Sequence, residues 1–129
     1  MAYSTVAKPS DHFTVHRYTG NGQSGRSVTT GTFQPDFCWI RKIESGSTDA
    51  MISYNWKANG AGSANTDGTI NSTVSVNSTA GFSIVKYAGI GGSTATVGHG
   101  LGTIPDLVMI KSIDGTENWC VSQRNMGSD

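Results

Sequence analysis

Residues 12–43 and 81–113 carry nearly the same pattern twice, and this duplication constrains the architecture more than any other feature. The first segment reads HFTVHRYTGNGQSGRSVTTGTFQPDFCWIRKI and the second reads GFSIVKYAGIGGSTATVGHGLGTIPDLVMIKSI. The matched positions include Phe13 and Phe82, Val15 and Ile84, Arg17 and Lys86, Tyr18 and Tyr87, Gly20 and Gly89, Val28 and Val97, Pro35 and Pro105, Asp36 and Asp106, Ile40 and Ile110, and Ile43 and Ile113. Apolar spacing and turn residues repeat, whereas no cluster of reactive groups does. The duplication therefore indicates how the chain folds and does not by itself indicate what the protein does.

The apolar pattern predicts short strands throughout the chain. Phe13–Tyr18 alternates apolar and polar residues, which is the period of a strand with one buried face. Phe37–Ile40 and its counterpart Leu107–Ile110 are apolar at every position, which favours central strands covered on both faces. No ten-residue segment has a helical period. We expect an all-β fold of roughly eight to ten strands, with the others at 27–30, 50–56, 69–76 (an edge strand), 82–87, 94–97 and 118–122.

The length of 129 residues suits one domain with its own core. Short apolar strands cannot bury both faces within one small sheet, whereas two repeats that face each other can. The duplication therefore predicts a two-sheet β-sandwich built from two similar halves. The domain is expected to span residues 12–129, with an internal repeat at 12–56 and 81–125, a connector at 57–80 and a polar N-terminal arm at 1–11.

Composition excludes several classes of partner. Charged residues make up 14% of the chain and the formal net charge is zero, so the clustered Lys and Arg of a nucleic-acid-binding protein are missing. No stretch approaches the roughly 20 apolar residues of a membrane helix, so no membrane insertion is expected. The N-terminal residues do not resemble a secretory signal. Cys38 and Cys120 lie in apolar runs and are interpreted as buried free thiols, with a disulfide as the alternative.

The residues that carry chemistry form no catalytic pattern. The histidines His12, His16 and His99 accompany no Gly-x-Ser-x-Gly elbow, and the serines lie in turn contexts. Asp36 and Asp106 each follow a proline before a strand, which is turn chemistry in which the carboxylate caps local backbone N–H groups. A metal site and a glycosidase pair are the alternatives for these carboxylates. The glycine-rich segments open no helix and so lack the usual phosphate cradle. We expect no enzyme activity, catalytic residue, cofactor or metal.

Aromatic residues beside polar loops are the remaining candidates for binding. Tyr54, Trp56 and Trp119 lie in or next to the strands that close each repeat, and exposed rings with amide and hydroxyl neighbours stack on sugars. His99, between two glycines, is a further candidate glycan contact. The alternative is that these rings pack the edge of the sandwich, while Trp39 in the most apolar run is expected in its core.

Several segments, in order along the chain, resemble virion-surface proteins. MAYSTVAKPSDHF, YTGNG, FQPDFCWIR, NWKANG, ATVGHGLGTIPDLVMIK and NWCV are similar to segments of tail-fibre-like proteins of marine bacteriophages, especially those that infect cyanobacteria. The resemblance covers nearly the whole chain and implies a jelly-roll or lectin-like (concanavalin-like) β-sandwich that serves attachment or decoration. The relatives carry a long insertion between the counterparts of Ile40 and Trp56 and continue past the counterpart of Trp119. The glycan-binding face of the larger module is therefore expected to be missing here.

The sequence leads to two functional expectations. The first is a bacteriophage virion structural protein, made in the host cytoplasm and displayed on the particle as a fibre, tail or capsid-decoration component in contact with other virion proteins. Edge strands and low charge favour a homo-oligomer, a trimer by analogy with fibres, whose N-terminal arm docks onto a neighbour through Tyr3, Val6, Lys8 and Pro9. The alternative is a receptor-recognition module that binds host surface glycans through Tyr54, Trp56, Trp119 and His99.

Overall fold

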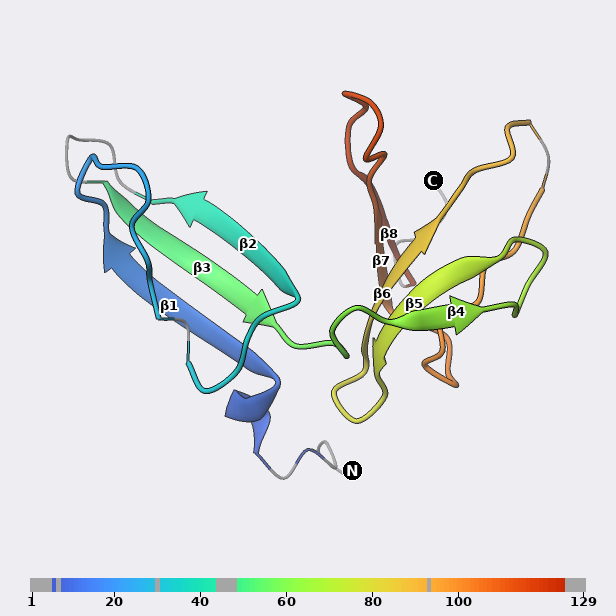
Figure 1. Ribbon diagram of the computed structural model, residues 1–129, viewed down its shortest axis with the longest axis horizontal. Helices are drawn as coiled ribbons and strands as arrows, with labels where there is room; N and C mark the ends of the chain where they lie inside the picture. The colour runs from blue at the N-terminus through green and yellow to red at the C-terminus, as the bar shows by residue number, and fades with distance from the viewer. Residues whose placement is uncertain (1–5, 7, 30, 44–48, 93, 125–129) are drawn as a thin grey trace.

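The computed structural model describes residues 6, 8–29, 31–43, 49–92 and 94–124. Within these ranges the chain forms one 3₁₀ turn and eight strands, which pair into three small antiparallel sheets (Figure 1). The elements are η1 (Pro9–Asp11), β1 (Phe13–Thr19), β2 (Phe37–Lys42), β3 (Ala50–Trp56), β4 (Ser63–Asn65), β5 (Ser72–Asn77), β6 (Phe82–Tyr87), β7 (Leu107–Ile110) and β8 (Cys120–Gln123). The sheet orders are β1-β3-β2, β4-β5-β6 and β7-β8. The expected all-β fold is confirmed.

Strand β3 is the centre of the first sheet, because both β1 and β2 pair with it. The registers place Phe13 and Phe37 opposite Trp56 on either side, so the side-chain alternation of the three strands coincides. One side of the sheet, which we call the aromatic face, carries Phe13, Val15, Phe37, Trp39, Ile52, Tyr54 and Trp56, and at the end away from Trp56 it also carries Arg17, Thr19, Arg41 and Ala50. The opposite side, the polar face, carries Thr14, His16, Cys38, Ser53 and Asn55, together with Tyr18, Ile40, Lys42 and Met51.

The chain covers the polar face and leaves the aromatic face open. The loop from β1 to β2 runs across the polar face (Figure 1), where a Cβ on Gly31 would lie 3.1 Å from the Thr14 methyl group. On the other side, Val15 remains 46% exposed and Trp39 54% exposed. A sheet with one solvated face normally turns its apolar side to the core. This sheet therefore has the opposite arrangement, since in a single chain its aromatic side faces solvent and its polar side is covered.

Asn55 organises the polar face. Its side chain is completely buried (0% exposed), and its amide nitrogen donates to the Thr14 carbonyl at 3.3 Å and to the Ser53 hydroxyl at 3.2 Å. Its amide oxygen accepts from the Cys38 thiol at 3.2 Å. One side chain thus links all three strands, and these bonds offset the cost of burying an amide.

The second sheet carries much of the small apolar interior. Val74 is buried in its central strand β5, and Ile70 is buried just before that strand. The loop after β6 crosses β5 so closely that a Cβ on Gly100 would lie 3.3–3.5 Å from the side chains of Val74 and Val76. The buried apolar residues of the described chain are few: Ala50, Ala58, Ile70 and Val74.

The third sheet is a hairpin whose strands are exposed throughout. β7 and β8 pair from Leu107 opposite Gln123 to Ile110 opposite Cys120, and every residue of both strands is exposed. The connecting turn is held locally, because the Lys111 ammonium donates to the Glu117 carbonyl at 2.6 Å. The backbone N–H of Glu117 and the Ser112 hydroxyl donate to the Glu117 carboxylate and lower the pKa of that group.

The two halves of the chain meet at an aromatic junction. The Trp56 ring stacks on Phe82 of β6 with centroids 6.1 Å apart, and Phe37 contacts the same Phe82 ring at 6.3 Å. Beside these rings, the Asp36 carboxylate accepts from the Ala58 backbone N–H at 2.7 Å. From this junction the first sheet and the β7–β8 hairpin diverge as two arms (Figure 1).

The expectations about the core are wrong at the apolar runs. Phe37–Ile40 and Leu107–Ile110 lie in edge strands, and Trp39 is on the surface. The reason is that β3 pairs with strands on both sides and takes the central place, while no second layer covers either run in the described chain. Cys38 and Cys120 are free, as expected, but both are exposed and not buried, since each lies in an edge strand.

The expected strands are partly confirmed. β1, β3 and β6 form at 13–18, 50–56 and 82–87, and β8 overlaps 118–122. Residues 27–29 and 94–97 form no strand, apart from one isolated bridge between Gly68 and Val97, and position 30 lies outside the described residues. Residues 69–76 supply β5, which is a central strand and not an edge strand, because the unexpected strand β4 pairs with its other side.

Replacement of Asn55 by Ala is expected to lower the free energy of unfolding by about 1–3 kcal/mol, because it removes a buried hydrogen-bonded group. Urea unfolding followed by circular dichroism at a fixed protein concentration measures the change. Asn118→Ala, at an exposed position, is the matched control and should change stability by less than about 0.5 kcal/mol. Equal losses in the two variants would contradict the role of Asn55.

Candidate functional site

Two of the candidate glycan contacts lie together on the aromatic face. Tyr54 and Trp56 occupy alternate positions of β3, so their rings project from the same side and stack with centroids 6.3 Å apart. Trp56 also contacts Phe13 at 5.0 Å and Phe37 at 5.3 Å, and Tyr54 contacts Trp39 at 6.0 Å. The aromatic face is therefore a continuous row of rings at favourable spacing.

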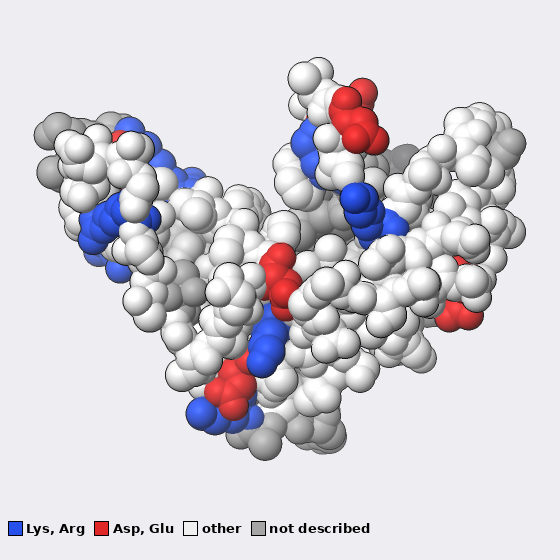
Figure 2. All heavy atoms as spheres, viewed as in Figure 1, with Lys and Arg blue, Asp and Glu red and all other residues white. Residues whose placement is uncertain are grey.

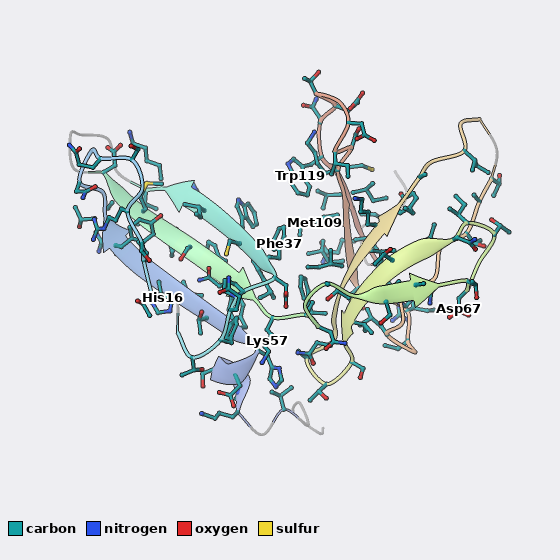
Figure 3. All side chains as sticks on the ribbon, viewed as in Figure 1. His16, Phe37, Lys57, Asp67, Met109 and Trp119 are labelled. Atoms are coloured by element: carbon teal, nitrogen blue, oxygen red, sulfur yellow. The ribbon has the colours of Figure 1, made fainter. Side chains whose placement is uncertain are left out.

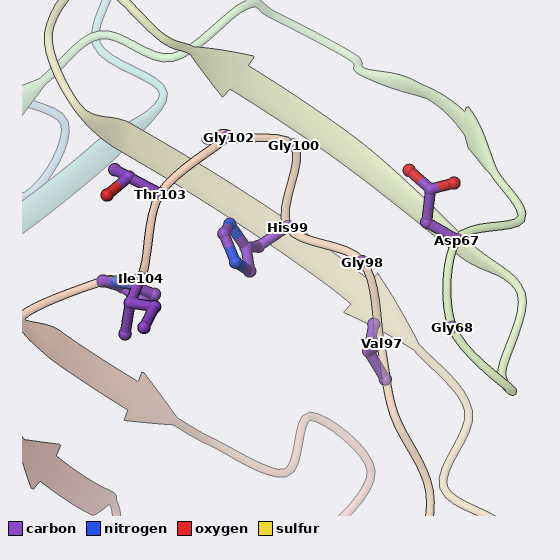
Figure 4. A pocket seen from close by; sticks show the side chains of 10 residues that line it. Asp67, Gly68, Val97, Gly98, His99, Gly100, Gly102, Thr103 and Ile104 are labelled. Atoms are coloured by element: carbon purple, nitrogen blue, oxygen red, sulfur yellow. The ribbon is translucent and has the colours of Figure 1, made fainter.

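The other two candidates lie elsewhere. Trp119 directly precedes β8 and lies on the hairpin arm, apart from the aromatic face (Figure 3). His99 lies in the loop that crosses the second sheet (Figure 4). The four residues named from the sequence thus occupy three separate places, because their proximity depends on strand order and register.

His99 lines an open hollow of about 720 Å³ (Figure 4). The Leu101 backbone N–H donates to His99 Nδ1 at 3.2 Å, which leaves the proton of the neutral ring on Nε2. The Asp67 carboxylate at the edge of the hollow accepts from the Asn65 amide at 3.3 Å. The remaining lining is Gly68, Val97, Gly98, Gly100, Gly102, Thr103, Ile104 and Pro105. The hollow has an imidazole and a carboxylate but no aromatic platform on which a sugar would stack.

The two repeat-equivalent carboxylates have separate surroundings. The Asp36 carboxylate accepts from the Ala58 N–H, which lies 22 residues further along the chain and not in the local turn that the sequence predicted. Asp106 instead lies 3.6 Å from the Arg124 guanidinium at the surface. Among the residues that the structure describes, no three His, Cys, Asp or Glu side chains come together as a possible metal site.

The other histidines also lie in structural contexts. The Asn77 amide lies 2.9 Å from His12 Nδ1 and also donates to the Lys57 carbonyl at 3.2 Å, which links β5 to the start of β1 and the end of β3. Among the described residues, His16 Nε2 on the polar face is buried and has no hydrogen-bond partner. Within the same residues, neither histidine ring is hydrogen-bonded to a serine or a carboxylate, as a catalytic triad needs.

The N-terminal arm is described only in part. Tyr3 lies outside the described residues, and Val6 is half-buried. The Lys8 ammonium pairs with the Asp11 carboxylate at 3.1 Å, and Pro9 begins the turn η1. Proline suits the first position of such a turn because its φ is already fixed. The chain therefore enters β1 through a local turn.

Sequence reasoning missed the residues that complete the aromatic face. The alternation over Phe13–Tyr18 did signal one apolar side, but it predicted a side covered by the same chain. Nothing in the spacing indicates that the β1–β2 loop covers the polar face. The missed members of the aromatic face are Phe13, Val15, Phe37, Trp39 and Ile52.

The architecture defines an all-β module with one uncovered aromatic sheet. The sequence matches the model of a family described as a domain of unknown function, DUF7483, over residues 8–50 and 44–129. The chain belongs to this family. The two matched segments overlap between β2 and β3. No curated protein and no solved structure matches the chain. Among the described residues, no helix is long and apolar enough to cross a membrane.

Gly68→Ala should displace the loop that forms the hollow. Gly68 has φ +94°, and a Cβ there would lie 2.4 Å from the Thr96 carbonyl oxygen, so we expect a loss of about 2 kcal/mol or more in unfolding free energy. Gly60→Ala is the matched control, since Gly60 has φ +64° with nothing within 4 Å and should lose only about 1 kcal/mol. Urea unfolding measures both, and equal losses would contradict the close approach at Gly68.

Proposed function

We propose that this chain is a structural protein of a bacteriophage virion, displayed on the particle surface as a fibre, tail or capsid-decoration component. The observation that carries the proposal is the aromatic face, a row of rings left uncovered by the chain that bears it. Monomeric proteins rarely expose large contiguous apolar patches, and such patches mark interaction sites. The ordered resemblance to virion-surface proteins suggests which assembly would cover it.

A non-enzymatic role is supported by the way the polar groups are used. Asp36 and Asn77 connect parts of the fold, and Asn55 links the strands of the first sheet. On the side of the molecule in Figure 2, the charged residues form small separate groups of both signs. This pattern supports the proposal that the protein acts neither through a catalytic centre nor by binding nucleic acid.

In this proposal the β-sandwich is completed by assembly. The hairpins β2–β3 and β7–β8 pair in the same antiparallel way, which supports two similar halves of a jelly-roll or lectin-like module. The pairing then differs, since β1 pairs with β3 whereas β6 pairs with β5. We propose a homo-oligomer, with three copies as the working number, that contacts other virion proteins and docks through the N-terminal arm (Tyr3, Val6, Lys8 and Pro9).

A carbohydrate-binding receptor module is the second candidate, favoured by the exposed ring of Trp39 beside Tyr54. The polar side chains beside these rings on the aromatic face are Arg17 and Arg41, on either side of Ile52, and the other neighbours are mostly apolar, so a stacked sugar would find few hydrogen-bond acceptors. Contact with another protein therefore fits this surface better than glycan binding does.

Mass spectrometry and antibody labelling of purified particles test the proposed location. We expect the chain in a fixed ratio to other structural proteins, and we expect it to stay bound in high salt, because apolar contacts are not screened by ions. A second density-gradient purification controls for host proteins carried along with the particles. Loss of the chain at that step would contradict the proposal.

An array of host surface glycans tests the second candidate. We expect the wild type to bind no better than Trp39→Ala, which removes an exposed ring and should leave the far-ultraviolet circular dichroism unchanged. Glycan binding that falls at least about tenfold in Trp39→Ala, with the fold intact, would favour the receptor module instead.

A further inference from the structure

A single chain exposes far more surface than a compact protein of its size. Its accessible surface is 9726 Å², whereas a folded monomer of 13.5 kDa exposes roughly 6,500 Å². The difference is about 3,200 Å² over the whole chain, and obligate interfaces bury about 2,000–5,000 Å² over both partners together. The chain therefore has surface that it can bury against another copy.

Apolar surfaces stand uncovered on two different arms of the molecule. The first arm carries the aromatic face. The second is the β7–β8 hairpin, which exposes Leu107, Met109, Val121 and Gln123 on one side and Val108 and Ile110 on the other. Figure 2 shows open space between the first sheet and the hairpin, so neither surface covers the other. The formal net charge is zero, so no overall repulsion opposes contact between copies.

We propose that the β7–β8 hairpin of one copy packs on the aromatic face of a second copy. Met109 lies opposite Val121 across the hairpin, just as Trp39 lies opposite Tyr54 across β2 and β3. The hairpin thus offers a flat, two-stranded apolar surface to a three-stranded one. Aliphatic and thioether side chains pack well against aromatic rings, and the contact supplies the second layer that the aromatic face lacks.

We take the contact to be made head to tail, so that each copy gives its hairpin to one neighbour and its aromatic face to another. A head-to-tail dimer still has one free aromatic face and one free hairpin, so copies add until a ring closes. Each chain in the ring has two neighbours. This inference specifies the contact within the proposed homo-oligomer, and it rests on the homo-oligomer alone. It predicts that the purified chain associates whether or not a virus particle contains it.

Native mass spectrometry and light scattering of the purified chain test the contact. The wild type should form a closed oligomer of three or more copies at micromolar concentration. Trp39→Lys on the aromatic face and Val121→Lys on the hairpin (51% exposed) should each raise the dissociation constant at least about thirtyfold. Both side chains are largely exposed in one chain, so circular dichroism should show an unchanged fold. Ile113→Lys, in the hairpin turn and 71% exposed, is the matched control and should leave the mass unchanged.

Mixing the two variants tests whether the contact is heterologous. Trp39→Lys retains an intact hairpin, and Val121→Lys retains an intact aromatic face. Neither variant should associate alone, whereas an equimolar mixture should form a heterodimer through one wild-type contact. Isotope labelling of one variant distinguishes this heterodimer by mass.

Three results would overturn the inference. A wild type that stays monomeric at every concentration would show that the exposed surfaces do not join copies. An oligomer lost in Trp39→Lys but retained in Val121→Lys would show that aromatic faces meet each other. An oligomer that survives both changes would place the interface elsewhere. Absence of the chain from particles, by contrast, would contradict the proposed location and leave this contact standing.

Discussion

Trp56 is the side chain on which the rest of the structure depends. Its ring packs against Phe13 and Phe37 of the neighbouring strands and stacks on Phe82 of the second sheet. It therefore centres the aromatic face and also joins the two halves of the chain, next to the hydrogen bond between Ala58 and Asp36. Because one end of the aromatic face is anchored at this junction, the remainder projects along an arm that the chain itself leaves open.

The inverted polarity of the first sheet has a physical cause. Polar groups can be satisfied within a small sheet by hydrogen bonds, as Asn55 shows, and a single loop then suffices to cover them. Aromatic rings need a packed layer on top, and the described chain buries too few apolar residues to provide one. Contact with another chain would supply such a layer, as the proposed assembly requires.

Among the described residues, the carboxylates and His99 that the sequence singled out lie apart from one another. The carboxylates Asp36 and Asp106 lie in different halves, one bound to a backbone N–H and the other beside Arg124. His99 braces its own loop through Leu101. What the chain concentrates in one place is a set of aromatic rings, and these rings are suited to packing.

The sequence by itself determined the class of fold and several strands. The alternation over Phe13–Tyr18 and the absence of a helical period are local properties that can be read along the chain. The sequence could not determine which strands would lie at an edge, because an apolar run such as Phe37–Ile40 looks the same whether its cover comes from its own chain or from another. Only the tertiary structure decided that β3 is central, that the β1–β2 loop covers the polar face, and that Tyr54 and Trp56 lie apart from Trp119 and His99. These features depend on long-range pairing and register, which local spacing does not encode.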